Sequence, residues 1–221
     1  MSAYRILEPA AGSGAFALEI IKRLHSSSKC FGFSFERALQ QVTFVEIDPD
    51  QVKLLKKNLN ALLSDLACGV SADGCVAHED FLTFDCEKYD FVVGNPPYVR
   101  YDQLPIWQRE EIRKNFETFS NRSDLYIAFY EKSLSLLRPK GILSFICPNR
   151  WLKNQYGKRQ RQLVNSSYAL EEVIDLEFVE PFEEKVLAYP AITTISNNLC
   201  PERKSTAYYR LDELENLTRI K

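Results

Sequence analysis

The sequence lacks any apolar run that approaches the length of a membrane span, and it lacks internal repeats. Met1 is followed directly by a short predicted strand, without the pattern of a signal peptide. We therefore expect a cytoplasmic protein with no membrane partner. The formal net charge is only −2, which excludes a chain that coats nucleic acid over its whole surface. Any contact with a polyanion must come from a local patch.

The sequence also lacks the cysteine and histidine spacing of a metal site. It contains no Cys-x-x-Cys pair, and only His25 and His78 could complete a ligand set. We interpret the cysteines as scattered buried thiols and expect neither metal nor disulfides. They are Cys30, Cys68, Cys75, Cys86, Cys147 and Cys200.

The most informative stretch is the apolar strand predicted at 90–93, which runs into the turn Asn95-Pro96-Pro97-Tyr98. The prolines carry no N–H, so this turn leaves carbonyl groups unused. The Asn95 side-chain oxygen and the Pro96 carbonyl can each accept one hydrogen from an exocyclic amine, while the Tyr98 ring offers a stacking face. Such bonds make a conjugated amine more nucleophilic. A stiff turn that merely ends a strand is the alternative interpretation.

Alternation of strands and helices predicts one α/β domain, which fits a length of 221 residues. We expect strands at 4–8, 42–48, 75–81, 90–94, 142–147, 170–178 and 191–197, and a strand-like segment at 206–210. The first predicted helix ends near residue 25, and others follow at 36–41, 50–66, 106–116 and 124–137. The domain is expected to cover 1–200, with 201–221 as a C-terminal tail.

Small residues after the first strand, including Gly12 and Gly14, let a ligand approach the backbone at a helix N-terminus. The second predicted strand ends in acids, where a doubly wound fold binds ribose hydroxyls, and Glu46 fits this role best. Asp80 and Phe81 end the third predicted strand, where an adenine amino group could bond to the acid and its ring could stack on the aromatic. An acid and an aromatic that merely end a strand remain the alternative.

Two polar regions follow the central turn. We interpret 100–123 as a surface connection that could serve as a lid or guide a nucleic-acid strand. The one basic segment with interleaved aromatics fits either contact with backbone phosphates or a solvated helix face. Its residues are Arg150, Trp151, Lys153, Tyr156, Lys158, Arg159 and Arg161.

The order and spacing of four motifs resemble those of adenine-specific DNA methyltransferases. The motifs read EPAAGSGAF at 8–16, VEID at 45–48, DFL at 80–82 and NPPY at 95–98, and the match continues to about residue 197. The resemblance implies a Rossmann-like class I methyltransferase fold, with a mostly parallel seven-stranded sheet and helices on both faces. It also implies S-adenosylmethionine as donor and the 6-amino group of a flipped-out adenine in double-stranded DNA as acceptor, within a restriction-modification or phage-defence system.

The resemblance assigns roles by position. The implied cofactor-binding residues are Glu8, Ala10, Gly12, Gly14, Phe16, Glu46, Ile47, Asp80, Phe81 and Asn95. The implied catalytic residues are Asn95 and Pro96, which accept from the target amine, and Tyr98 and Phe182, which enclose the flipped base.

The chain departs from the family pattern at both ends. Family members carry a helical motif before the first strand and a target-recognition domain after the catalytic region; here three residues precede Tyr4 and about twenty follow residue 200. We therefore expect a separate target-recognition or specificity subunit or domain as a partner, and the tail 201–221 could be the start of a truncated target-recognition region. The alternatives are a methyltransferase acting on protein glutamine or RNA, and a truncated non-catalytic module.

Overall fold

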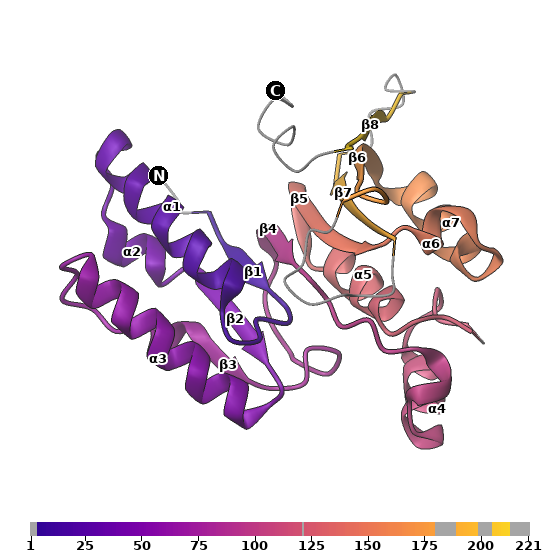
Figure 1. The fold of residues 1–221 in the computed structure, drawn as a ribbon, viewed down its shortest axis with the longest axis horizontal. Helices are drawn as coiled ribbons and strands as arrows, with labels where there is room; N and C mark the ends of the chain where they lie inside the picture. Colours follow the sequence, from indigo (N-terminus) through magenta and orange to yellow (C-terminus); the bar gives the residue numbers. More distant parts are fainter. Residues whose placement is uncertain (1–3, 121, 180–188, 199–204, 213–221) are drawn as a thin grey trace. The chain divides into compact units, whose positions relative to one another are not determined.

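The computed structural model describes residues 4–120, 122–179, 189–198 and 205–212. The chain divides into two compact units (Figure 1). Unit 1 comprises Met1–Asn95 and Leu136–Arg138, and unit 2 comprises Pro96–Ser135 and Pro139–Lys221. The boundary falls at the peptide bond between Asn95 and Pro96, within the motif that carries the functional prediction.

Unit 1 contains four parallel strands in the order β3 (Val76–His78), β2 (Val42–Glu46), β1 (Ile6–Glu8) and β4 (Tyr89–Gly94). Ile6 lies opposite Val42 on one side and Phe91 on the other. Because parallel strands present their carboxyl ends at one edge, the loops after β1, β2, β3 and β4 emerge together. This edge carries most of the predicted cofactor residues.

Three α-helices accompany these strands: α1 (Ala15–Phe31), α2 (Phe35–Leu39) and α3 (Pro49–Asp65). A short 3-10 helix, η1 (Asp73–Cys75), precedes β3. Asp48 caps α3, since its carboxylate accepts from the backbone N–H groups of Asp50 and Gln51. The helices share one apolar cluster with β2 and the segment before β3. Its buried members are Ala11, Ala17, Ile21, Leu39, Val42, Phe44, Leu55, Leu59, Leu63, Ala72 and Cys75.

Several predicted boundaries in unit 1 were wrong; β2, for example, ends at Glu46 and not at 48. The two largest errors concern α1 and β3. Helix α1 continues past residue 25 to Phe31, because its terminator is Gly32, which adopts the left-handed region at φ 70° and donates its backbone N–H to the Ser28 carbonyl. The third strand ends at His78 and not at 81. The chain turns there, since the Asp80 carbonyl accepts from the backbone N–H groups of Thr83 and Phe84.

Unit 2 contains the strand order β5-β7-β6-β8. These strands are β5 (Leu137–Pro148, whose first two residues belong to unit 1), β7 (Pro190–Ser196), β6 (Ala169–Asp175) and β8 (Ala207–Arg210). β7 is antiparallel to β5 and β6, whereas β8 is parallel to β6. The described residues thus form eight strands where seven were expected, because the strand-like segment near the C-terminus pairs with β6.

The helices of unit 2 are η2 (Tyr101–Gln103), α4 (Ile106–Asn115), α5 (Tyr126–Ser135), α6 (Arg150–Lys153), η3 (Gln155–Gly157) and α7 (Lys158–Ser167). β5 begins five residues earlier than predicted because Lys140 and Gly141 pair with Asn197. Within the described residues, no helix is long and apolar enough to cross a membrane.

Candidate active site

Glu8 ends β1 as a buried acid, with only 1% of its surface exposed. Within the described residues, its Oε2 atom has no hydrogen-bond partner. Burial raises the pKa of the Glu8 carboxyl well above its usual value, and the nearby charge of Glu46 raises it further. An unpartnered buried carboxyl oxygen is costly, and a ligand that supplies a donor would remove this cost.

The loop after Glu8 is held by the end of β2. The backbone N–H of Gly12 donates to Glu46 Oε2 at 2.7 Å, and those of Ile47 and Asp48 donate to Glu46 Oε1 at 2.9 Å. A carboxylate has about four acceptor positions, so these three bonds leave room for another donor such as a hydroxyl group. Glu46 thus has both the position and the remaining capacity expected of a ribose ligand.

Gly14 has to be glycine for two reasons. Its φ of 105° is one that L residues rarely adopt, and a Cβ there would lie 2.8 Å from Leu55 Cδ1 on α3. At Gly12, where φ is 53°, an added Cβ would meet nothing within 4 Å, so the space beside this residue is open. Ala10 and Phe16, on either side of these glycines, are partly buried. The loop therefore combines a close helix approach at Gly14 with an open face at Gly12.

The predicted adenine contacts divide into one exposed and two less exposed residues. Ile47 is 60% exposed at the tip of β2, which suits a residue that packs on a ligand. Asp80 accepts from the backbone N–H of Leu82 at 2.9 Å, and Phe81 is only 2% exposed. Asp80 and Phe81 thus lie in a turn after β3 and not on the strand itself, and their contact with adenine stays a prediction.

Asn95 follows β4, and its Oδ1 atom is buried without a hydrogen-bond partner among the described residues. The preceding Gly94 approaches the loop after β1: a Cβ at Gly94 would lie 3.4 Å from Pro9 Cδ and 3.5 Å from Glu8 Cγ. The two unpartnered oxygens of unit 1 at this edge, on Glu8 and Asn95, therefore belong to neighbouring strand ends. Both can accept hydrogen bonds from a ligand.

In unit 2, Tyr98 is fixed at both its hydroxyl group and its ring. The hydroxyl donates to the Ile146 carbonyl on β5 at 3.0 Å. The ring meets Tyr126 edge-on, with centroids 6.4 Å apart at 79°. Burial, and then the neighbouring Cys147, raise the pKa of Tyr98, so the hydroxyl stays protonated. These contacts hold the ring in one orientation, as a stacking platform requires. Pro96 is buried, and Phe182 lies outside the described residues.

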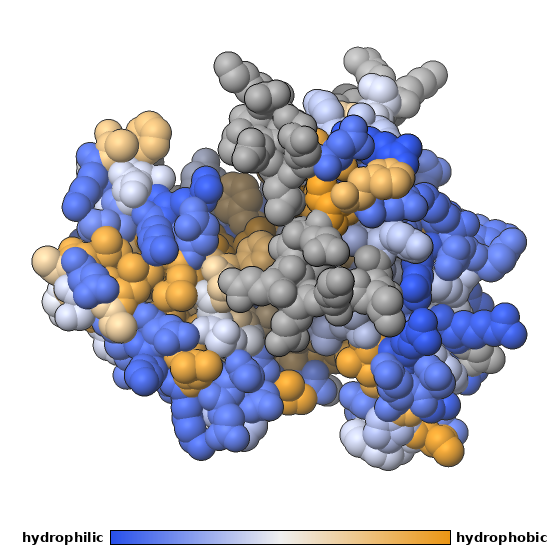
Figure 2. Space-filling view, in the orientation of Figure 1, coloured by the Kyte–Doolittle hydropathy of each residue, from blue (hydrophilic) through white to orange (hydrophobic). Residues whose placement is uncertain are grey.

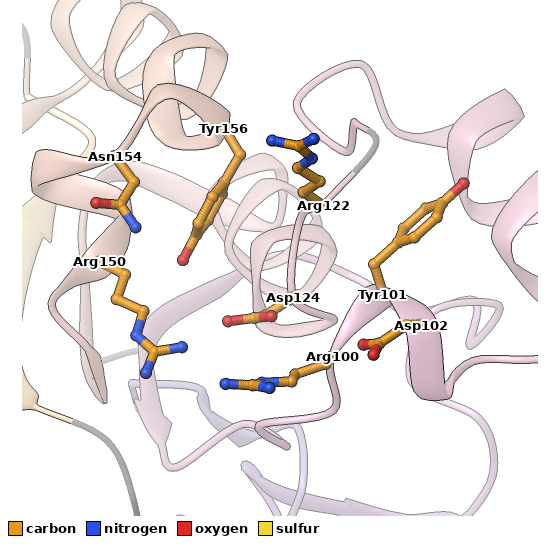
Figure 3. Close-up of a pocket in the computed structure, with 8 residues that line it drawn as sticks. All are labelled: Arg100, Tyr101, Asp102, Arg122, Asp124, Arg150, Asn154 and Tyr156. Carbon is orange, nitrogen blue, oxygen red and sulfur yellow. The ribbon is translucent and has the colours of Figure 1, made fainter.

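Unit 2 also contains a polar pocket of about 310 Å³ that the sequence did not predict (Figure 3). Its lining residues are Arg100, Tyr101, Asp102, Arg122, Asp124, Arg150, Asn154 and Tyr156. They come from three separate segments, so no local pattern could have identified the set. Only Arg150 and Tyr156 belong to the basic segment that the sequence singles out.

Several cations of the basic segment contact other residues of unit 2. The guanidinium of Arg159 donates to the Glu117 carbonyl, and that of Arg161 donates to the carbonyls of Trp151 and Asn154. The Nζ atom of Lys153 lies 3.7 Å from Oε2 of Glu177. Hydrophilic residues dominate the visible surface over α7 in Figure 2. Most of the segment's cations thus support local structure or face solvent, while Arg150 lines the pocket.

Known proteins resemble this chain in sequence and in fold. Residues 46–182 match the family model described as Eco57I restriction-modification methylase. The chain belongs to this family. It is 39% identical over 201 residues to the Type II methyltransferase M.PaeR7I of Pseudomonas aeruginosa, covering 87% of this chain and 35% of the relative. It is 38% identical over 215 residues to the Type II methyltransferase M.XhoI of Xanthomonas vasicola, covering 92% and 38%.

A structural comparison confirms the fold. A protein from Listeria monocytogenes, described as a class I S-adenosylmethionine-dependent methyltransferase, superposes with a TM-score of 0.70 at 17% identity. The match covers 96% of this chain and 59% of that one. The predicted Rossmann-like class I methyltransferase fold and the predicted resemblance to restriction-modification methyltransferases are therefore confirmed. The chain spans little more than a third of the length of the two Type II methyltransferases that it matches.

Proposed function

We propose that this chain is the catalytic region of a DNA methyltransferase of a restriction-modification system. It would transfer a methyl group from S-adenosylmethionine to the 6-amino group of an adenine flipped out of double-stranded DNA. The observation that carries the proposal is the buried Oδ1 atom of Asn95, which has no hydrogen-bond partner among the described residues. The backbone carbonyl of the next residue, Pro96, provides a second acceptor. Two neighbouring acceptors match the two hydrogens of one amino group.

The residues of unit 1 fit S-adenosylmethionine. Its ammonium group could donate to Glu8, whose Oε2 has no partner among the described residues. Its ribose hydroxyls could bind to the remaining acceptor capacity of Glu46, and its adenine could pack on the exposed Ile47. S-adenosylmethionine supplies a methyl group already activated by a sulfonium. The protein is therefore required mainly to align the reactants and to polarise the amine.

In this proposal, Asn95 and Pro96 accept both amine hydrogens, so that the nitrogen lone pair is directed at the methyl carbon. The N–C bond forms as the S–C bond breaks, and a proton then leaves the positively charged methylated nitrogen for water. Tyr98 stacks on the flipped base, and Phe182 is assigned to the opposite face by resemblance alone. A separate target-recognition domain or subunit would select the DNA sequence.

The test is a methylation assay with the 221-residue chain, labelled S-adenosylmethionine and three acceptors assayed side by side: duplex DNA, RNA and a release-factor protein. Digestion of the DNA to nucleosides, followed by mass spectrometry, identifies the product. We expect N6-methyladenine. N4-methylcytosine would contradict the choice of base, and labelling of RNA or protein alone would contradict the choice of DNA.

A further inference from the structure

The pocket of unit 2 gathers opposite charges around an open space. Figure 3 shows the carboxylate of Asp124 beside the guanidinium of Arg100, with the hydroxyl of Tyr156 directed toward Asp124. Arg150 lines the same side, and Arg122 and Asp102 complete the charged lining. Three positive charges against two negative charges leave one net positive charge, which matches a singly charged anion.

The arginines of this pocket retain unused donors. Within the described residues, no salt bridge involves Arg100, Arg122 or Arg150. Burial raises the pKa of the Asp124 carboxyl, and the positive charges of Arg150 and Arg100 oppose this rise. A guanidinium carries five N–H donors in a fixed planar arrangement, so each of these arginines can still bind an anion such as a phosphate.

A pair of tyrosines borders the pocket's acid. The hydroxyl groups of Tyr126 and Tyr156 share a hydrogen bond of 2.9 Å. Figure 3 shows the Tyr156 hydroxyl directed toward Asp124. Tyr126 in turn meets the ring of Tyr98 edge-on. The pocket and the predicted base platform thus belong to one connected set of side chains.

We propose that this pocket binds one phosphodiester group of the substrate strand, through the guanidiniums of Arg100 and Arg150. Its identification as a DNA phosphodiester next to the target base rests on the proposed function. Arg100 follows Tyr98 by two residues, so their Cα atoms are at most about 7 Å apart. Arg100 thus leaves the chain from the same short segment as the predicted base platform. The single net positive charge favours a phosphodiester over a polyphosphate.

The first experiment tests the pocket with the smallest suitable probe, the dinucleotide TpT, which carries a single phosphodiester. The 221-residue chain, labelled with ¹⁵N-arginine, is titrated with TpT and with its neutral methylphosphonate analogue. We expect TpT to shift the Nε signals of Arg100 and Arg150 and not that of Arg23, an exposed arginine on α1. Unmoved signals, or equal shifts with the neutral analogue, would overturn the proposal.

The second experiment measures duplex DNA affinity against salt for the double variant Arg100→Gln/Arg150→Gln and the control Arg23→Gln. Loss of one phosphate contact should weaken binding about tenfold or more and lower the slope of log K against log salt by about 1. S-adenosylmethionine affinity and the unfolding temperature, measured on the same samples, should match the control. Equal DNA affinity and slope in both variants would contradict the assignment.

Different results would contradict the proposed function and the phosphodiester site. If TpT shifts both arginines but no acceptor DNA is methylated, the proposed function is wrong and the phosphodiester site stands. If DNA is methylated but the double variant equals Arg23→Gln in affinity and salt slope, the proposed function stands and the phosphodiester site is wrong.

Discussion

The backbone N–H of Gly12 donates a 2.7 Å hydrogen bond to Oε2 of Glu46, which joins the loop after β1 to the end of β2. One carboxylate thus both shapes the glycine loop and, in the proposed function, binds the ribose. The same side chain accepts from Ile47 and Asp48. Replacement of Glu46 should therefore weaken donor binding in two ways, because it removes a ribose ligand and releases the glycine loop.

For Glu46→Gln, we expect the dissociation constant of S-adenosylmethionine to rise about 10- to 150-fold, because hydrogen bonds to a charged group contribute about 1.5 to 3 kcal/mol. Isothermal titration calorimetry measures this change. Glu19→Gln, at an exposed position on α1, is the matched control and should bind the donor like the wild type. An unchanged dissociation constant in Glu46→Gln would remove this residue from the donor site.

For Asn95→Ala, we expect kcat to fall by about two to three orders of magnitude, if the lost acceptor supplies about 3 to 4 kcal/mol in the transition state. Donor affinity should remain nearly unchanged. Stability should also change little, because the removed Oδ1 has no partner among the described residues. Single-turnover kinetics, donor titration and thermal unfolding on one preparation test all three. A parallel loss of donor affinity would place Asn95 in a different role.

For Tyr98, two variants separate the ring from the hydroxyl. Tyr98→Ala should weaken the flipped state by about 1 to 3 kcal/mol through loss of stacking. Tyr98→Phe keeps the ring and removes the hydroxyl that bonds to the Ile146 carbonyl, so it should flip the base nearly as well. Duplex DNA with 2-aminopurine at the target position reports flipping by its fluorescence increase. Equal fluorescence in both variants and wild type would contradict the stacking role.

The buried Glu8 should make stability depend on pH. Burial raises its pKa in the folded state, so folding favours the protonated form. Its contribution is full below the pKa of the unfolded chain and is lost as pH rises through the raised folded pKa. Glu8→Gln removes this titration. Chemical denaturation from pH 4 upward should show wild type losing stability relative to Glu8→Gln as pH increases, and parallel curves would show that Glu8 is not perturbed.

Much of the fold followed from local pattern. The spacing of apolar residues along the sequence predicted strands around Leu7, Phe44 and Val92, and the structure confirms them as β1, β2 and β4. Boundaries failed where a distant or local hydrogen bond overrode the pattern. Helix α1 continued through the serine run until Gly32 ended it, and the pairing of Gly141 with Asn197 continued β5 beyond the predicted strand. A bond such as that between Gly141 and Asn197 depends on the position of a distant partner, which a window of sequence does not contain.

The sequence by itself determined the chemistry at the strand ends: the glycines after β1, the acid after β2 and the amide before two prolines are residue types whose capabilities do not depend on distant neighbours. The tertiary structure alone decided which of these groups lack partners, as Glu8 and Asn95 do among the described residues. It also brought Arg100, Arg122 and Arg150 to one pocket. The reason is that burial and charge are properties of an assembled environment, to which segments far apart in the chain contribute.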